Sequence, residues 1–428
     1  MAEGRTDETI FTWGAPPLKF GPGAVDEIGF ELQQHAVVRA LVLTDAGLAA
    51  TGIPQRVVET LGTYGIEAML YDAVHVEPTD LSINAAADWA RAHGPWDGFV
   101  AVGGGSVLDT AKAVNLLTSY DGVLEDYLNK PIGLGKAPPG PLKPLVAVPT
   151  TAGTGSESTA MCILDVLSLK VKTGISHWRL RPTLAVVDPL LTMTLPPEVT
   201  AAAGMDILCH ALESYTARDY RSYPRRQAQE RVIYCGSNPV SDVWTERAMT
   251  LLAQSFRPAV HDGATDLQAR SDLMLAATFA GMGFGNAGVH LPHANAYPIA
   301  GRVKDYRPVC YDVDEALVPH GQAVSLTAPA AFRFTFDSRP ERHLRAAALI
   351  APDLAAQPTP SEQLPRAVVD IMRDIGIPSG IAAVGYGEAD IDDLVGGTMK
   401  QQRLLATCPR EVSAEDVAGV FAASLCNW

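Results

Sequence analysis

The sequence predicts an α/β N-terminal domain with a parallel, doubly wound sheet, followed by an all-helical C-terminal domain. In residues 1–195, short apolar segments alternate with segments of helical periodicity, as in repeated strand–helix units. After Asp188-Pro189 the strand pattern fades, and helical periodicity continues to Trp428. A chain of 428 residues suits two domains, which we place at residues 1–195 and 196–428.

Five strands are expected in the first domain, because five segments are rich in Val, Leu and Ala and show little alternation. They lie at residues 40–44, 68–71, 98–102, 145–148 and 184–187. Helical periodicity predicts helices at residues 24–34, 47–62, 80–92 and 106–118. The two prolines within residues 194–198 predict a break, followed by the first helix of the second domain.

Charge and composition favour small-molecule substrates over nucleic acids or membranes. The chain has 33 basic and 48 acidic residues, a net charge of −15, and this acidity disfavours phosphate backbones and anionic lipids. Residues 273–301 contain no Asp, Glu, Lys or Arg and are long enough to span a membrane. Their five glycines and two histidines instead favour a buried helix and turn.

The six cysteines are scattered, and none forms a CxxC pair. Scattered cysteines in a long chain indicate reduced thiols and a reducing compartment. The first 14 residues contain no apolar segment and carry early acidic residues, which argues against a secretory signal and a transit peptide. The expected location is therefore cytoplasmic.

The first candidate cofactor site is a glycine-rich turn between the third expected strand and the following helix. Gly103, Gly104 and Gly105 lack Cβ atoms, so their N–H groups and that of Ser106 can approach a pyrophosphate. Asp109 lies in the first turns of the same helix. The pattern is not GxGxxG, and a tight strand-to-helix turn without a ligand is an equally good interpretation.

Two further features follow expected strands. The loop at residues 149–157 contains Thr150, Thr151 and Thr154, whose hydroxyls can bind ribose, phosphate or nicotinamide. Its alternative is a polar turn, which a second such loop after a neighbouring strand makes less favourable. Asp45 ends the first expected strand, where a carboxylate can bind the adenosine ribose and repel a 2′-phosphate. Asp45 would serve equally well as a helix N-cap.

A carboxylate and several histidines suggest a metal site in the second domain. Asp206 and His210 are four residues apart and share one helix face in an apolar segment. His290, His293 and His320 stand in apolar surroundings further along the chain. One carboxylate with three imidazoles suits Fe²⁺ or Zn²⁺ with an open position for substrate. Spacing alone leaves open whether His290 or His293 is the third ligand.

Together these motifs resemble the iron-containing (group III) alcohol dehydrogenase family over nearly the whole chain. The segments that show this resemblance are PTTAGTGSE at 149–157, GMDILCHALE at 204–213 and VPHG at 318–321. VEPTD at 76–80, GFGNAGVH at 283–290 and PERH at 340–343 resemble the hydroxyacid–oxoacid transhydrogenase branch. The resemblance implies the dehydroquinate-synthase-like fold of that family, bound NAD(H), a site in the cleft between the domains and a homodimer.

The resemblance also implies roles for individual residues. Lys172 lies at the cofactor, and His290 is a neighbour of the metal instead of a ligand. Tyr297 stands where most relatives carry a second histidine, so Tyr297 and His290 are the catalytic candidates. The implied metal ligands are Asp206, His210, His293 and His320.

The predicted activity is metal-dependent hydride transfer between small hydroxyacids and a nicotinamide. By resemblance, 4-hydroxybutyrate and 2-oxoglutarate give succinate semialdehyde and 2-hydroxyglutarate, and the reduced cofactor stays tightly bound. The alternatives are an NAD-dependent dehydrogenase that releases its cofactor, a metal-dependent lyase on the related fold, and a metal-structural protein. We also hypothesise that Arg302, Lys304 or Arg307 binds the substrate carboxylate. A solvated loop whose basic residues pair with nearby acidic ones is at least as good an interpretation of this segment.

Overall fold

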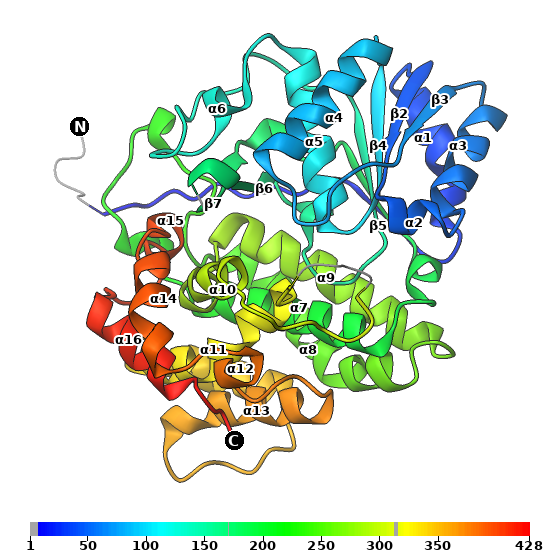
Figure 1. The fold of residues 1–428 in the computed structure, drawn as a ribbon. Coiled ribbons are helices and arrows are strands. Elements are labelled where there is room, and N and C mark those ends of the chain that lie inside the picture. The colour runs from blue at the N-terminus through cyan, green and yellow to red at the C-terminus, as the bar shows by residue number, and fades with distance from the viewer. Residues whose placement is uncertain (1–6, 170, 312–315) are drawn as a thin grey trace. The chain divides into compact units, whose positions relative to one another are not determined.

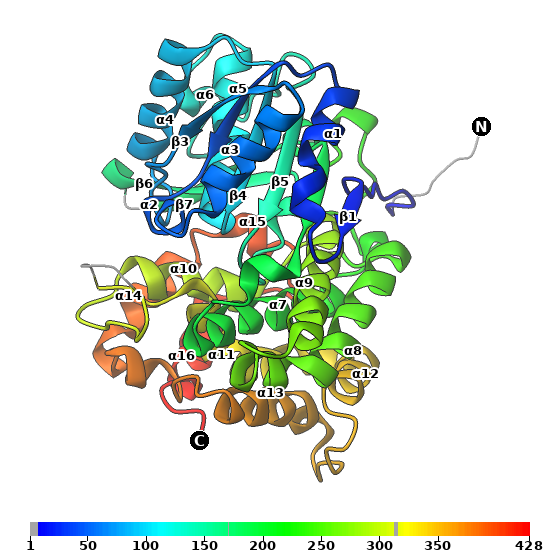
Figure 2. The ribbon, with the colours of Figure 1, turned by 90° about the vertical axis from the view of Figure 1, so that its right-hand side faces the viewer.

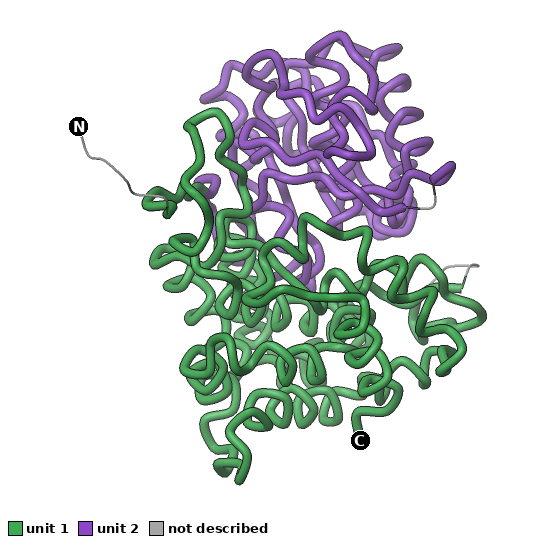
Figure 3. Tube along the Cα trace, turned by 90° about the vertical axis from the view of Figure 1, so that its left-hand side faces the viewer, with its two compact units in different colours: residues 1–14, 195–428 green, residues 15–194 purple. Residues whose placement is uncertain are grey.

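A computed structural model describes residues 7–169, 171–311 and 316–428. The chain forms two compact units, coloured separately in Figure 3: unit 2 is Ala15–Thr194, and unit 1 is Met1–Gly14 with Leu195–Trp428. The predicted first domain, residues 1–195, includes the residues before Ala15, which the structure groups with unit 1. They belong to unit 1 because the Asn286 side chain accepts from the N–H of Gly14 (3.0 Å) and donates to its carbonyl (3.1 Å).

Unit 2 contains a six-stranded parallel sheet in the order β1-β8-β5-β4-β2-β3. All five expected strands are present, with ends within one residue of the prediction. They are β2 (Arg39–Leu43), β3 (Glu67–Tyr71), β4 (Gly98–Gly103), β5 (Leu145–Pro149) and β8 (Leu184–Val187). The short β1 (Leu18–Phe20), which pairs with β8, was not predicted.

Helices cover both faces of this sheet, as Figures 1 and 2 show. Leu41 and Leu43 of β2 pack with α4 (Asp80–His93) and α5 (Gly105–Ser119). Ala40 and Val42 pack on the other face with α1 (Ile28–Gln34) and α3 (Ile53–Thr63). Successive residues of a strand point to opposite faces, so both faces of β2 are apolar. The predicted doubly wound fold is confirmed.

Two predicted helices are each divided in the structure. The segment at 24–34 begins as a 3₁₀ helix, Ala24–Glu27, before α1. The segment at 47–62 is split into α2 (Ala46–Ala49) and α3. The cause of the split is Gly52, whose φ of 79° lies in the left-handed region and interrupts the helix.

The strand order reverses between β2 and β4, since the chain runs from β2 outward to β3 and then returns to the other side of β2. In open α/β sheets, ligands bind at the carboxyl ends of the strands beside such a switch point. Asp45 follows β2 and the glycine-rich turn follows β4. The topology therefore places both candidate cofactor features at the switch point.

An antiparallel hairpin of β6 (Met161–Val166) and β7 (Val171–Ser176) was not predicted. Its second strand reads VKTGIS, which lacks the apolar run used to identify the other strands. The hairpin register sets Asp165 directly opposite Lys172, which brings the two charges together.

Unit 1 is helical, as predicted for the second part of the chain. The segment at 273–301 forms the end of α9 and then α10, separated by Gly288 with a φ of 97°. No helix among the described residues has the length and apolarity needed to cross a membrane. The main helices are α7 (Pro197–Thr216), α8 (Pro239–His261), α9 (Leu267–Ala287), α10 (Leu291–Gly301), α11 (His320–Thr335), α12 (Pro340–Ile350), α13 (Gln363–Asp374), α14 (Ile391–Thr398) and α16 (Ala414–Ala423).

Candidate functional site

Two buried side chains of α7 form the base of the candidate site. Asp206 and His210 lie one turn apart, and His210 Nε2 is 3.6 Å from Asp206 Oδ1. The His210 ring stacks on Phe284 of α9 with centroids 3.8 Å apart. This stacking and the helix backbone hold the imidazole beside the carboxylate.

Two more imidazoles reach the same oxygen from other helices. His293, in the first turn of α10, places Nε2 3.4 Å from Asp206 Oδ1. His320, the first residue of α11, places Nε2 3.7 Å from it. The ligand atoms of Asp206, His293 and His320 all lie within 4.8 Å of one another. We call Asp206, His210, His293 and His320 the Asp206 cluster.

Several polar atoms of the Asp206 cluster are buried without a hydrogen-bond partner among the described residues. They include Asp206 Oδ1 and His293 Nε2. Buried polar atoms in native proteins normally have a partner, so these atoms indicate a site for a ligand. One carboxylate oxygen with imidazole nitrogens suits Fe²⁺ or Zn²⁺. The His320 side chain is 29% exposed, so solvent reaches the cluster there.

The electrostatics of the Asp206 cluster also fit a cation. Burial lowers the pKa of His210 to about 3, which keeps this imidazole in the neutral form that binds metals. Burial opposes a charge on His293 as well, but the Glu213 and Asp206 carboxylates raise its pKa to about 9. In the metal-free protein a proton on His293 thus offsets part of the negative charge of these carboxylates, and a cation can replace it.

Glu213, on the same face of α7, orients His293 from behind. Its carboxylate accepts from His293 Nδ1 and from the backbone N–H groups of His290 (2.8 Å) and His293 (3.2 Å). In the neutral form of His293, a proton held on Nδ1 by Glu213 leaves the lone pair of Nε2 available to a cation beside Asp206. Glu213 was not predicted as a site residue, although it ends the segment GMDILCHALE. Its spacing of seven residues from Asp206 was the available signal, since residues i and i+7 share a helix face.

Glu213→Gln is expected to lower the affinity for a divalent cation by about 10- to 100-fold, because glutamine keeps the shape but loses the charge that holds His293. Titration with Co²⁺, followed by its absorption spectrum, measures this affinity. Glu246→Gln is the matched control, since Glu246 accepts from Tyr215 Oη at 2.8 Å on the far side of α7. Equal Co²⁺ affinity for Glu213→Gln and the parent protein would contradict this role.

The two catalytic candidates occupy different positions. His290 is fully buried, with Nε2 3.1 Å from Thr216 Oγ1 and Nδ1 4.0 Å from Glu213 Oε1. It lies behind Glu213 and outside the Asp206 cluster. Tyr297 lies one turn after His293 on α10, is half-buried, and has its ring centroid 6.4 Å from that of His320.

The glycine-rich turn and the threonine loop lie against each other at the carboxyl ends of β4 and β5. Thr150 N–H donates to the Gly103 carbonyl at 3.1 Å. A Cβ on Gly105 would come within 2.6 Å of Thr154, and one on Gly104 within 3.4 Å of Thr151. A side chain at position 105 would therefore clash with Thr154, whereas one at position 104 would make an ordinary contact.

Asp109 and Lys112 of α5 bind the segment that follows the threonine loop. The Asp109 carboxylate accepts from Ser156 Oγ (2.5 Å) and Ile163 N–H (2.9 Å), and lies 3.3 Å from Lys112 Nζ. Lys112 is fully buried and also donates to Met161 O at 2.7 Å. Asp109, a predicted cofactor residue, thus connects the helix after the glycine-rich turn to the segment at 156–163.

Asp45 acts as a helix cap in the structure. One carboxylate oxygen, Oδ1, accepts from the N–H of Leu48 at 2.9 Å and begins α2. The structure therefore contains the helix cap that was the alternative interpretation of Asp45, and the cap uses only Oδ1.

Lys172 lies in a charged cluster formed by three segments of unit 2. Its Nζ is 2.5 Å from Glu77 Oε2 and 3.0 Å from Asp165 Oδ2. Burial opposes the lysine charge, but the two carboxylates raise the pKa of Lys172 well above its usual value. Ser106 Oγ in the glycine-rich turn accepts from the Glu77 N–H at 3.1 Å. Glu77 has a φ of 57°, which is uncommon for a residue with a side chain. We call Glu77, Asp165 and Lys172 the Lys172 cluster.

The basic residues proposed for the substrate carboxylate have other partners. Arg302 lies 3.4 Å from Asp393, and Lys304 lies 2.7 Å from Asp390; both basic side chains are exposed by more than 40%. These pairs match the alternative of a solvated, charge-paired loop.

Comparison with known proteins identifies the family. Residues 16–189 match the family described as iron-containing alcohol dehydrogenase, and residues 200–425 match the Fe-containing alcohol dehydrogenase family, C-terminal. The chain belongs to the iron-containing alcohol dehydrogenase family. Membership makes this protein an oxidoreductase acting on CH–OH groups and implies an iron ion and a nicotinamide dinucleotide.

Curated relatives place this iron-containing alcohol dehydrogenase in the transhydrogenase branch. Hydroxyacid–oxoacid transhydrogenases from Bos taurus, Xenopus laevis and Homo sapiens are 45%, 46% and 44% identical to it. The matches cover 99% of this chain and 91%, 92% and 91% of those proteins. Among solved structures, 1,3-propanediol oxidoreductase has a TM-score of 0.84 and 31% identity, covering 97% of this chain and 100% of that one. The alcohol dehydrogenase from Oenococcus oeni has the same TM-score and coverage at 26% identity.

These relatives correct the expected location. The prediction of a cytoplasmic protein is wrong, because the transhydrogenases that match over nearly the full length are named as mitochondrial. Scattered unpaired cysteines indicate a reducing environment, and that property alone does not distinguish the cytoplasm from the interior of an organelle.

Proposed function

We propose that this enzyme is a hydroxyacid–oxoacid transhydrogenase that retains its dinucleotide between two half-reactions. 4-Hydroxybutyrate gives up a hydride from its carbinol carbon together with its hydroxyl proton. 2-Oxoglutarate takes up a hydride at its keto carbon together with a proton. The products are succinate semialdehyde and 2-hydroxyglutarate, and the exchange needs no external oxidant or reductant.

One observation carries the proposal: three imidazole Nε2 atoms lie 3.4–3.7 Å from one orphaned carboxylate oxygen, in a chain 44–46% identical to named transhydrogenases. Asp206, His210, His293 and His320 would hold the ion, Fe²⁺ or alternatively Zn²⁺. A bound divalent ion supplies Lewis-acid stabilisation of a developing alkoxide. Glu213 keeps His293 in the binding tautomer.

The chain's own residues supply proton handling and cofactor binding in this proposal. The phenol of Tyr297, near His320, would hold or move the hydroxyl proton, while His290 would act through Glu213 as a positioning residue. The N–H groups of Gly104, Gly105 and Ser106 would bind the pyrophosphate at the start of α5, with Gly103 allowing the approach. Thr150, Thr151 and Thr154 would line the ribose and nicotinamide, with Asp109 bracing their loop. NAD supplies the hydride carrier when bound.

Asp45 is proposed to select NAD over NADP, because its carboxylate would repel a 2′-phosphate. Asp45→Asn keeps the cap on α2, since asparagine is an equally good N-cap, but removes the charge. We expect the preference for NAD to fall by about ten-fold, equivalent to roughly 1.4 kcal/mol. Binding of both nucleotides, measured by calorimetry, tests this. Equal binding of NAD and NADP by the parent protein would refute the assignment.

Retention of the cofactor separates the proposal from an ordinary dehydrogenase. Mass spectrometry of the undenatured, purified protein should find NAD(H) bound, and transfer from 4-hydroxybutyrate to 2-oxoglutarate should proceed without added NAD. Activity that depends strictly on added NAD, with NADH released to solution, would instead establish the dehydrogenase alternative. The homodimer implied by the resemblance stays a prediction, which light scattering can test.

The Lys172 cluster is proposed to slow cofactor release. It joins the loop after β3, the β6–β7 hairpin and the glycine-rich turn by the contacts given above. Glu77→Gln weakens this connection and should speed NADH dissociation by about ten-fold, or roughly 1.4 kcal/mol. Stopped-flow fluorescence measures the rate, and Glu67→Gln, an exposed partner of Arg39, is the control. An unchanged rate in Glu77→Gln, with NADH retained by the parent protein, would exclude the Lys172 cluster as the cause.

A further inference from the structure

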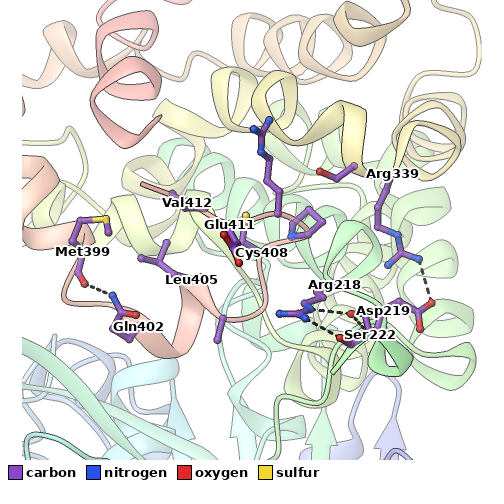
Figure 4. Close-up of a pocket in the computed structure, with 14 residues that line it drawn as sticks. Arg218, Asp219, Ser222, Arg339, Met399, Gln402, Leu405, Cys408, Glu411 and Val412 are labelled. Atoms are coloured by element: carbon purple, nitrogen blue, oxygen red, sulfur yellow. Dashed lines mark hydrogen bonds and ion pairs between the residues drawn. The ribbon is translucent and has the colours of Figure 1, made fainter. Parts of the chain in front are cut away.

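Unit 1 contains a pocket that no residue of the Asp206 cluster lines and that the proposed reaction does not use. Its volume is about 760 Å³, which lies in the range of small-molecule sites, roughly 300–1,000 Å³. Its walls come from the turn after α7, the start of α12 and the segment at 399–412. Figure 4 shows Arg218, Asp219 and Arg339 on one side and Met399, Leu405 and Val412 on the other.

The basic wall of the pocket is oriented by neutral acceptors. Arg218 donates from Nε to Ser222 Oγ (2.9 Å) and from Nη2 to the Ser222 carbonyl (2.8 Å). Its guanidinium lies over the Tyr223 ring, 4.5 Å from the centroid. Arg339 donates from Nη1 to Ser237 Oγ at 2.6 Å. Uncharged oxygens therefore orient Arg218, whereas Arg339 combines a hydroxyl acceptor with a longer ion pair to Asp219.

The carboxylate of Asp219, which lines the same wall, is already paired with another arginine. Asp219 binds the Nε and Nη2 of Arg221 at 3.0 and 3.1 Å, in a bidentate pair. It lies farther from Arg339 Nη2, at 3.5 Å. Burial first and the neighbouring Arg342 second lower the pKa of Arg339, and the Asp219 and Asp242 carboxylates oppose this shift. Asp219 therefore pairs with two guanidinium groups, Arg221 and Arg339, while the contacts of Arg218 given above are with uncharged groups.

We propose that this pocket binds a small organic anion, with its oxyanion on Arg218 and Arg339 and an apolar body against Met399, Leu405 and Val412. Guanidinium groups held in place offer paired N–H donors to a carboxylate or a phosphate, and little side-chain entropy is lost on binding. Glu411 also lines the pocket, and its carboxylate has no hydrogen bond or ion pair with any described residue. Its charge opposes the anion and limits the affinity.

Calorimetry with hexanoate, hexyl phosphate and hexanamide tests the proposal on the full-length protein. The three probes share an apolar chain and differ in the head group, so the anions should bind and the neutral amide should not. The tighter of the two anions identifies the ligand as a carboxylate or a phosphate. No binding of either anion, or equal binding of hexanamide, would overturn the proposal.

Two variants with opposite effects assign the binding to this pocket. Arg218→Gln should weaken anion binding by about ten-fold or more, because it removes a charged donor that Ser222 and Tyr223 hold in place. Glu411→Gln should strengthen binding by about three-fold, because it removes the opposing charge. Arg366→Gln, which breaks an exposed pair with Asp370 on α13, is the control and should change nothing. Anion binding unchanged in both pocket variants would place it elsewhere and refute the inference.

Discussion

His293→Ala and His320→Ala are each expected to abolish transhydrogenase activity and to release most of the bound metal. Each substitution removes one of the nitrogens that surround Asp206 Oδ1, so an ion would be left with an incomplete ligand set. Loss of an outer residue that only orients a ligand costs about 10- to 100-fold, so loss of a ligand itself should exceed that. Metal content by plasma mass spectrometry and activity should fall together.

The variant His290→Ala distinguishes a metal ligand from a neighbouring histidine. Its imidazole faces Thr216 and not Asp206, so the variant should retain its metal. The substitution opens a buried cavity, and metal content is therefore compared per folded protein, measured by circular dichroism. A His290→Ala protein that loses metal while His293→Ala keeps it would reverse the ligand assignment.

Asp109→Ala is expected to lower the free energy of unfolding by about 3–5 kcal/mol, because it leaves the charge of Lys112 buried and unpaired. Lys112 has no exposed surface, and Asp109 is the carboxylate at 3.3 Å from its Nζ. Urea denaturation measures the loss. Asp88→Ala, which removes a 74% exposed carboxylate paired with Arg91, should cost less than about 1 kcal/mol.

The Asp109→Ala variant should also regain stability as pH rises. Burial lowers the pKa of Lys112 in the folded protein, and Asp109 normally opposes this shift. Without Asp109 the folded state loses the proton at a lower pH than the unfolded chain does. The unfolded state then binds more protons, so stability increases with pH until the unfolded lysine titrates near about 10.4. A loss of stability that does not depend on pH would show that Lys112 is not the source of the cost.

Much of the fold was predictable because its signals are local. Five strands of the sheet are uniformly apolar, and this pattern follows from burial on both faces. Asp206 and His210 could be paired from their spacing, since four residues make about one helical turn. The glycine-rich turn could be recognised because a missing Cβ has a local consequence for the backbone.

Other features depended on contacts between distant parts of the chain. Spacing left His290 and His293 as alternatives, and the structure separates them by placing His293 Nε2 beside Asp206 and His290 beside Thr216. Glu213 reaches His293 across 80 residues of sequence, and Lys172 reaches Glu77 across 95. The pocket beside Arg218 likewise joins three separate segments of unit 1.

The sequence by itself thus determined the fold class and the helix that holds Asp206 and His210. It also determined the positions of the glycine-rich turn and the threonine loop at the ends of their strands. Only the tertiary structure decided which histidine faces the carboxylate, which carboxylate orients that histidine and which charges pair. The physical reason is the distance along the sequence between the residues that interact. Backbone geometry relates residues within a turn or a strand, whereas the orientation and charge state of a buried side chain are set by whichever residues pack around it, however far away they lie in the sequence.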